Sequence, residues 1–209
     1  MMLLKFQIKN MGSLFYLPLL FCAFYIIFLL LIPAELEGIL FLILQIAVLP
    51  FSFWWPVFNI YDLYQNNVEE IFATYIGKNL LFDYLRFTSL FLILILFLFF
   101  ITNIKVGQPF PLHLVFLLIG QTFIISSFVL LITIYLKSIE IASMSAILYV
   151  FSEAVTTGEI FPWPHIFIFS LDSHNLNVLW IQMIIYLFIS AIFLFASIKY
   201  AKTIERNII

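Results

Sequence analysis

The sequence predicts an all-α membrane protein with six transmembrane helices, and three observations lead to this fold class. The 209 residues are 65% hydrophobic and 10% charged, whereas soluble domains are about 45–50% apolar and about 25% charged. The apolar residues form long runs, and one spanning helix needs about 20 of them. Basic residues gather in the segments that join alternate runs. We therefore expect short connections between the spans and no soluble catalytic domain.

Six apolar runs of spanning length follow one another along the chain. They cover residues 14–32, 39–61, 80–102, 112–136, 139–157 and 177–199. The first run has no small-residue cleavage site, so we interpret it as an uncleaved span and not as a signal peptide. The second contains Pro50 and Pro56, whose missing N–H groups are expected to kink it. Residues 1–209 are thus expected to form a single transmembrane domain.

The basic residues set the expected orientation in the membrane. Lys105 alone falls on one predicted side, and the other eight fall opposite: Lys5, Lys9, Lys78, Arg86, Lys137, Lys199, Lys202 and Arg206. Cytoplasmic connections of membrane proteins carry an excess of Lys and Arg. We therefore expect both termini in the cytoplasm of a bacterial cell and the chain in its plasma membrane.

A short amphipathic helix is predicted at residues 68–76, between the second and third spans. Its apolar side chains recur at helical spacing: Val68, Ile71, Phe72, Tyr75 and Ile76. Asn67 suits the N-cap and Gly77 the C-cap. So short a helix is marginal in water, so its apolar side must rest on the membrane interface, the bundle or a partner. Interfacial helices usually carry basic residues, whereas the acidic Glu69 and Glu70 favour a protein partner.

A second notable segment precedes the last span. Residues 161–171 are strongly apolar but too short to cross a bilayer. Gly158, Pro162 and Pro164 interrupt regular structure around it. We therefore expect the fifth span to stop early and a re-entrant half-helix to dip back. Irregular backbone at that depth must be buried in protein or line a cavity.

These features together resemble the permease subunits of type-two ABC exporters. In that family the connection before the third span often has Glu-Glu, then small and apolar residues, then a basic residue. The corresponding stretch here is Glu69-Glu70-Ile71-Phe72-Ala73-Thr74-Tyr75-Ile76-Gly77-Lys78. The proline-and-basic step that often follows the acidic pair in the family is absent. The matching topology covers nearly the whole chain.

The resemblance implies a division of labour between subunits. The coupling helix, which would dock into a cytoplasmic ABC ATPase dimer, would comprise Val68, Glu69, Glu70, Ile71, Phe72, Ala73, Thr74, Tyr75 and Ile76. A second permease subunit, identical or related, would face this one. ATP and Mg would bind the ATPase, because this chain has no Gly-rich phosphate-binding loop. An exported peptide or lipid-like substrate would suit the aromatic and aliphatic spans.

Polar residues within the spans are candidates for the translocation path, namely Glu153, Gln121 and Gln182. An ionisable group inside a membrane is a functional candidate by default. Two interpretations of Glu153 stay open: it lies within the membrane, or the fifth span ends before it and leaves it in water. Polar side chains such as Gln45 also join helices to one another without binding a ligand.

Other functional classes are disfavoured. The three histidines, His113, His165 and His174, have a spacing that matches no metal-ligand motif, so we expect no metal site. The net charge of -2 provides no basic surface for nucleic acid. The spans lack a Ser-His or Asp-Asp constellation typical of an intramembrane enzyme. The main alternative to an exporter is a non-transporting structural or assembly subunit, whose amphipathic helix would be an interfacial anchor.

Overall fold

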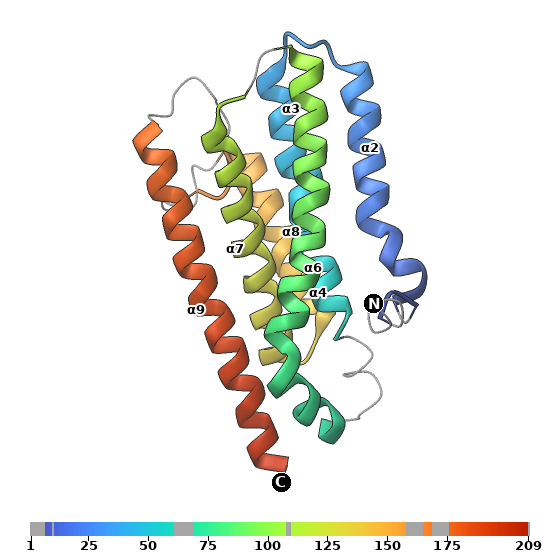
Figure 1. The fold of residues 1–209 in the computed structure, drawn as a ribbon, viewed down its shortest axis with the longest axis vertical. Helices are drawn as coiled ribbons and strands as arrows, with labels where there is room; N and C mark the ends of the chain where they lie inside the picture. The colour runs from blue at the N-terminus through green and yellow to red at the C-terminus, as the bar shows by residue number, and fades with distance from the viewer. Residues whose placement is uncertain are drawn as a thin grey trace.

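The computed structural model describes residues 7–9, 11–60, 69–107, 110–157, 165–168 and 176–208, without the side chains of 69–78, 176–177 and 204–208. This part of the chain is an all-helical bundle (Figure 1). Its helices of spanning length and hydropathy are Gly12–Leu31, Glu37–Phe58, Asn79–Val106, Leu112–Leu136, Ile139–Thr156 and Val178–Thr203. Each of the six predicted spans thus corresponds to a helical segment long and apolar enough to cross a membrane, as a multi-pass membrane protein requires.

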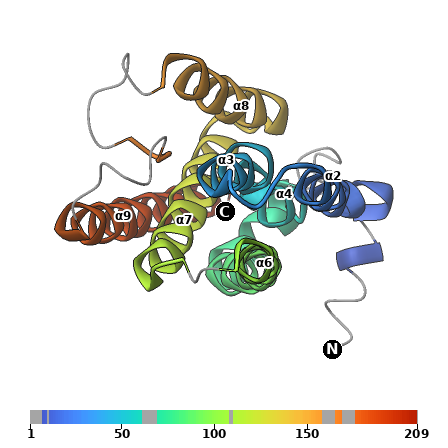
Figure 2. The same ribbon diagram turned by 90° about the horizontal axis from the view of Figure 1, so that it is seen from above.

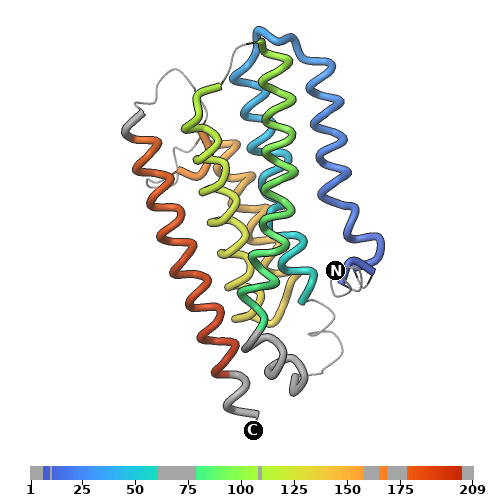
Figure 3. Tube along the Cα trace, viewed as in Figure 1, coloured from blue at the N-terminus to red at the C-terminus, as the bar shows by residue number. Residues whose placement is uncertain are grey.

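The spans run alternately up and down the bundle, so that both termini lie toward its lower end (Figure 3). The 3-10 helix η1 (Gly12–Tyr16) leads into α2 (Leu17–Leu31), which has Pro18 in its first turn, where a missing N–H costs little. The fourth, fifth and sixth spans lie in the helices α7 (Leu112–Leu136), α8 (Ile139–Thr156) and α9 (Leu176–Ile208). A left-handed residue ends each of the first two of these, namely Lys137 and Thr157.

The second span is irregular, as its prolines predicted. It begins as α3 (Glu37–Ile43), widens into the π-helix η2 (Leu44–Val48), tightens into the 3-10 helix η3 (Leu49–Phe53) and ends as α4 (Trp54–Phe58). Pro50 lies at the start of the 3-10 turn, where it cannot donate to the preceding turn. Short π-helical turns often occur at functional sites, and this one carries Gln45.

The third span is longer than predicted. The helix α6 (Glu69–Val106) is continuous over 38 residues, so the prediction that a separate helix at 68–76 ends at Gly77 is wrong. A glycine in a helix costs only about 1 kcal/mol relative to alanine. This cost does not end the helix at Gly77, because the residues on both sides of the glycine are helical. Val68 and Asn67 lie outside the described residues. The amphipathic character of the segment stays a prediction.

The helix α7 forms the centre of the bundle. It packs against α6, α8, α9 and the broken second span, and Figure 2 shows it between them. Gly120 of α7 faces Tyr186 of α9, and a Cβ added at Gly120 would lie 3.4 Å from the Cβ of Tyr186, in ordinary van der Waals contact. Most of the polar side chains of α7 are therefore enclosed by protein and not exposed to lipid.

Side chains tie both ends of α2 to the neighbouring spans. At one end the ammonium group of Lys105 binds the backbone carbonyls of Leu29 and Ile32. A cation at a helix C-terminus satisfies carbonyls that lack intrahelical partners. This contact gives a structural reason for Lys105, the one basic residue that the predicted topology places opposite the other eight. At the other end the indole N–H groups of Trp54 and Trp55 donate to the chain just before α2, over 2.8 and 2.9 Å.

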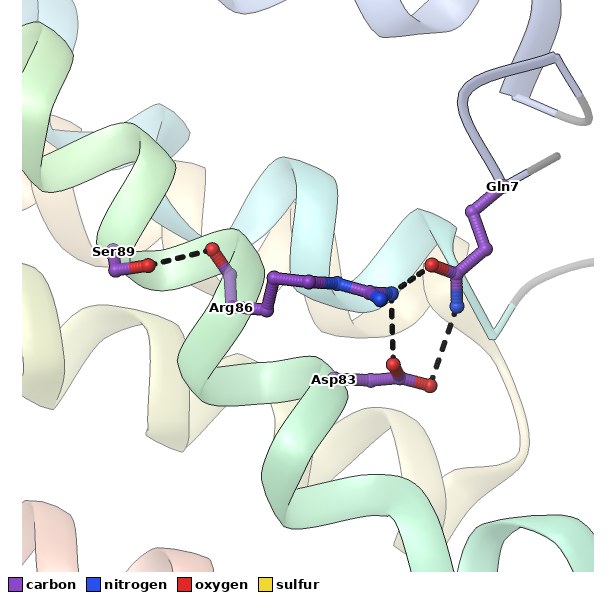
Figure 4. A network of polar contacts seen from close by, with 4 residues as sticks. All are labelled: Gln7, Asp83, Arg86 and Ser89. Carbon is purple, nitrogen blue, oxygen red and sulfur yellow. Dashed lines mark hydrogen bonds and ion pairs between the residues drawn. The ribbon is translucent and has the colours of Figure 1, made fainter. Parts of the chain in front are cut away.

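A buried polar network attaches the N-terminal segment to α6 (Figure 4). The guanidinium of Arg86 forms an ion pair with Asp83 at 2.8 Å and donates to the side-chain oxygen of Gln7. The amide of Gln7 in turn donates to the second carboxylate oxygen of Asp83 over 3.3 Å. Charge-assisted hydrogen bonds of this kind are among the strongest in proteins, so the network holds the N-terminal segment against the third span.

We expect Asp83→Ala to release the N-terminal segment, because Arg86 and Gln7 lose their shared acceptor. Met11 is 7% exposed, so a cysteine at that position, in a Cys22→Ala background without the native thiol, reports the release. Its modification by a water-soluble maleimide should accelerate about tenfold or more, since breaking a buried pair costs several kcal/mol. Ser89→Ala is the control, because its hydroxyl binds a carbonyl of its own helix. An unchanged rate in Asp83→Ala would show that the network does not hold the segment.

Candidate functional site

A non-helical segment, residues 165–168, lies between the helices ahead of the last span, with its first two residues partly buried and its last two buried. Phe167 is 2% exposed and Ile168 is 4% exposed. Figure 2 shows the segment as a short orange piece in the space between α8 and α9. We call residues 165–168 the buried loop. Backbone polar groups at membrane depth must be satisfied by protein or water, because hydrocarbon offers no hydrogen bonds.

Two side chains accept the N–H groups of the buried loop. The carboxylate of Glu153 accepts from the backbone N–H of Phe167 over 3.1 Å. The side-chain oxygen of Gln45 accepts from the backbone N–H of Ile168 over 3.0 Å. Glu153 lies in the last turn of α8, and Gln45 lies in the π-helical turn of the second span. Spans two and five therefore hold the segment that precedes span six.

Two further side chains donate to the carbonyls of the buried loop. The amide of Gln121 on α7 donates to the carbonyl of Ile166, and the hydroxyl of Tyr186 on α9 donates to the carbonyl of His165. The same amide nitrogen of Gln121 also donates to the side-chain oxygen of Gln45 over 3.1 Å. The buried loop is thus held by side chains from four spans.

Glu153 is fully buried. The helix α8 continues past it to Thr156, so the fifth span does not end before this residue, and the interpretation that leaves its side chain in water is wrong. Burying a carboxylate is costly without hydrogen bonds or a compensating charge. The bond from Phe167 accounts for one of its two oxygens.

The other two predicted path residues are buried as well. Gln121 is 0% exposed and Gln182 is 3% exposed. Gln182 lies four residues before Tyr186, on the same face of α9. Sequence reasoning therefore selected two residues that contact the buried loop, Glu153 and Gln121, and a third, Gln182, that is buried elsewhere on the Tyr186 face of α9. It did not single out Tyr186, whose only signal was an aromatic hydroxyl within an apolar span.

The cluster retains hydrogen-bonding capacity. Among the described residues, the buried atoms without a hydrogen-bond partner in the cluster and on the Tyr186 face of α9 are Gln45 Nε2, Gln121 Oε1, Glu153 Oε2, His165 Nδ1 and Gln182 Oε1. Most buried polar groups in proteins have a partner, and each exception requires an explanation. Three of these five atoms are acceptor oxygens. The cluster can therefore receive hydrogen bonds from a further donor.

The remaining predicted site residues fall elsewhere. Within the described ranges, no group of three or more His, Cys, Asp or Glu side chains could hold a metal ion, and His174 lies outside those ranges. The backbone of residues 69–76 is helical, whereas their side chains are outside the description. The proposed re-entrant segment 161–171 is described only at 165–168, which is partly or fully buried and not helical, so its re-entrant character stays a prediction.

Comparison with known proteins gives no functional lead. No protein family, curated protein or solved structure matches this chain. Functional proposals for the chain therefore depend on its sequence pattern, its fold and the buried cluster.

Proposed function

We propose that this chain is the membrane-spanning permease subunit of an ATP-driven ABC exporter. Its substrate is an amphipathic peptide or another lipid-like molecule, which it moves out of the cell or out of the membrane. The observation that carries the proposal is the buried loop ahead of the sixth span, held by side chains of four other elements. A purely lipid-embedded anchor has no need of irregular backbone inside its bundle, because every such group must be satisfied.

The length of α6 supports the same proposal. The helix starts at Glu69, but the apolar run of the third span starts only at about residue 80 of the sequence. The residues before this run add about 16 Å of helix at 1.5 Å per residue. This extension carries the acidic pair Glu69 and Glu70 at its tip. In the proposed complex the extension is the coupling helix, and it contacts a cytoplasmic ABC ATPase dimer.

In the proposed mechanism the same helices alternate between two packing arrangements. ATP and Mg bind to the ATPase partner, whose closure moves the coupling helices of this chain and of a second permease subunit. That movement shifts the bundle between an inward-facing and an outward-facing arrangement. Both termini are cytoplasmic in this proposal, and the complex resides in the plasma membrane.

Copurification tests the proposal directly. The chain is tagged in its own host and extracted in mild detergent, and the copurifying proteins are identified and quantified by mass spectrometry. We expect a stoichiometric ABC-type ATPase. The reproducible presence of some other membrane complex without an ATPase would reject the exporter and favour the alternative, a non-transporting structural or assembly subunit.

A further inference from the structure

A pocket of about 260 Å³ lies between α7, α8 and α9. In the described part of the bundle, α8 and α9 each pack against α7 and scarcely touch one another, and Figure 2 shows α8 and α9 on different sides of α7. The three helices line the pocket mainly with apolar side chains, including Ile124, Phe128, Ala146, Val150, Ile189 and Phe193. The lining also includes Tyr149 of α8, whose side chain interacts with Glu153. The apolar part of the pocket suits a hydrocarbon chain.

One end of the pocket adjoins the polar cluster. On α7, Gln121 precedes Ile124 by three residues, and on α8, Glu153 follows Val150 by three. Residues three or four apart share one face of a helix. Ile166 lines the pocket, and the next residue of the buried loop donates its N–H to Glu153. The pocket is thus apolar along its length and polar at the end beside the buried loop.

The helix α9 follows the same pattern. Ile189 lines the pocket, Tyr186 lies one turn before it, and Gln182 lies one turn before Tyr186. The polar side chains of all three helices are therefore displaced from the apolar lining in the same direction, toward the end of the bundle where α8 ends and α9 begins. Three independent segments of sequence converge on one amphipathic site.

The polar end of the pocket favours a ligand group that donates hydrogen bonds and carries a positive charge. Glu153 Oε2, Gln121 Oε1 and Gln182 Oε1 are buried acceptors without a partner among the described residues. The orientation of the Gln121 amide is fixed, because its nitrogen donates to Ile166 and Gln45. Tyr149 and the backbone N–H of Phe167 interact with the Glu153 carboxylate, but neither carries a positive charge. A cation that also donates hydrogen bonds would stabilise this buried carboxylate further. A primary ammonium group has three N–H donors.

We propose that this pocket binds a cationic amphiphile, with its hydrocarbon chain along the apolar lining and its primary ammonium group at Glu153. The amide oxygen of Gln121 provides a further acceptor. A cavity of roughly 150 Å³ holds one benzene ring, so the pocket accommodates a chain of about ten heavy atoms. The site lies within one subunit, so binding requires no ATPase.

Photolabelling in a bilayer tests this site. The full chain, with any subunits that copurify, is placed in phosphatidylcholine nanodiscs and labelled with decylamine that carries a diazirine in its chain. We expect saturable labelling of the pocket-lining peptides of α7, α8 and α9. Unlabelled decylamine should compete at a concentration about tenfold or more below that of 1-decanol, since hydrogen bonds to charged groups are worth at least this factor. Equal competition by the amine and the alcohol would overturn the proposal without any mutant.

Two variants separate the parts of the site. Glu153→Gln should abolish the preference for the amine over the alcohol, because it removes the negative charge at nearly constant shape. Ile189→Phe should reduce saturable labelling about fivefold or more by filling the pocket. The matched control is Ile192→Phe, which adds the same ring at a position that is 49% exposed and outside the pocket lining. A preference that persists in Glu153→Gln, or equal effects of the two phenylalanine variants, would overturn the assignment.

The labelling result and the exporter proposal can fail separately. Labelling that spreads without saturation over the lipid-facing side chains would reject the pocket and leave the ATPase partnership untouched. Absence of an ATPase on copurification would reject the exporter proposal. It would not affect the preference of the pocket for the amine, which the labelling experiment measures independently.

Discussion

Replacing Gln45 with leucine is expected to lower the free energy of unfolding by about 2–4 kcal/mol, because two buried donors lose their acceptor. The side-chain oxygen of Gln45 accepts from the backbone N–H of Ile168 over 3.0 Å and from the amide of Gln121 over 3.1 Å. Leucine has a similar size but accepts neither bond. The loss falls on Ile168 in particular, since no water competes for its N–H at 4% exposure.

The measurement is unfolding of the detergent-solubilised chain by a denaturing detergent, followed by circular dichroism. Ser52→Ala is the matched control on the same span. Ser52 is fully buried, and its hydroxyl has no hydrogen-bond partner in the described part of the chain. Removing it should be neutral or slightly stabilising, because an unsatisfied hydroxyl leaves the interior. If Gln45→Leu proved as stable as Ser52→Ala, side chains would not hold the buried loop in the way described.

The fold was largely predictable because bilayer physics acts on local sequence. An apolar run of about 20 residues has few alternatives to a spanning helix, and all six runs form one. Pro50 likewise predicted the break in the second span, since a missing N–H acts wherever the residue lies. Gly77 failed as a predicted helix end for a related reason. Glycine only weakens a helix, and the residues on both sides of it continue α6.

The candidate site was only partly predictable, because its contacts are not local. The bond from Ile168 to Gln45 joins residues 123 positions apart, and the bond from Gln121 to Gln45 joins residues 76 apart. Hydropathy shows that each glutamine lies inside a span, but it does not show that they meet. The orientation of Gln45 also depends on a π-helical turn, whose start and end leave no clear composition signal. Polar residues in spans can thus be selected from sequence, whereas their common partner cannot.

The double substitution Glu69→Lys and Glu70→Lys is expected to abolish coupling between this chain and its proposed ATPase. In the exporter proposal these carboxylates lie at the start of α6, on the extension that contacts the ATPase. Reversing charges at a complementary interface places like charges together, which costs several kcal/mol. Substrate-stimulated ATP hydrolysis by the purified complex should therefore fall by about tenfold or more, since 1.4 kcal/mol is already a factor of ten.

An interfacial anchor predicts the opposite sign. Lysines on the polar face of a helix strengthen its attraction to anionic lipid headgroups, so the same double variant would keep or improve membrane assembly. Glu140→Lys is the control, because Glu140 is exposed near the start of α8 and lies outside the proposed coupling helix. Loss of ATP hydrolysis in Glu69→Lys with Glu70→Lys, but not in Glu140→Lys, supports docking by α6. Full activity in the double variant would exclude this acidic pair from the ATPase interface and shift the balance toward the structural subunit.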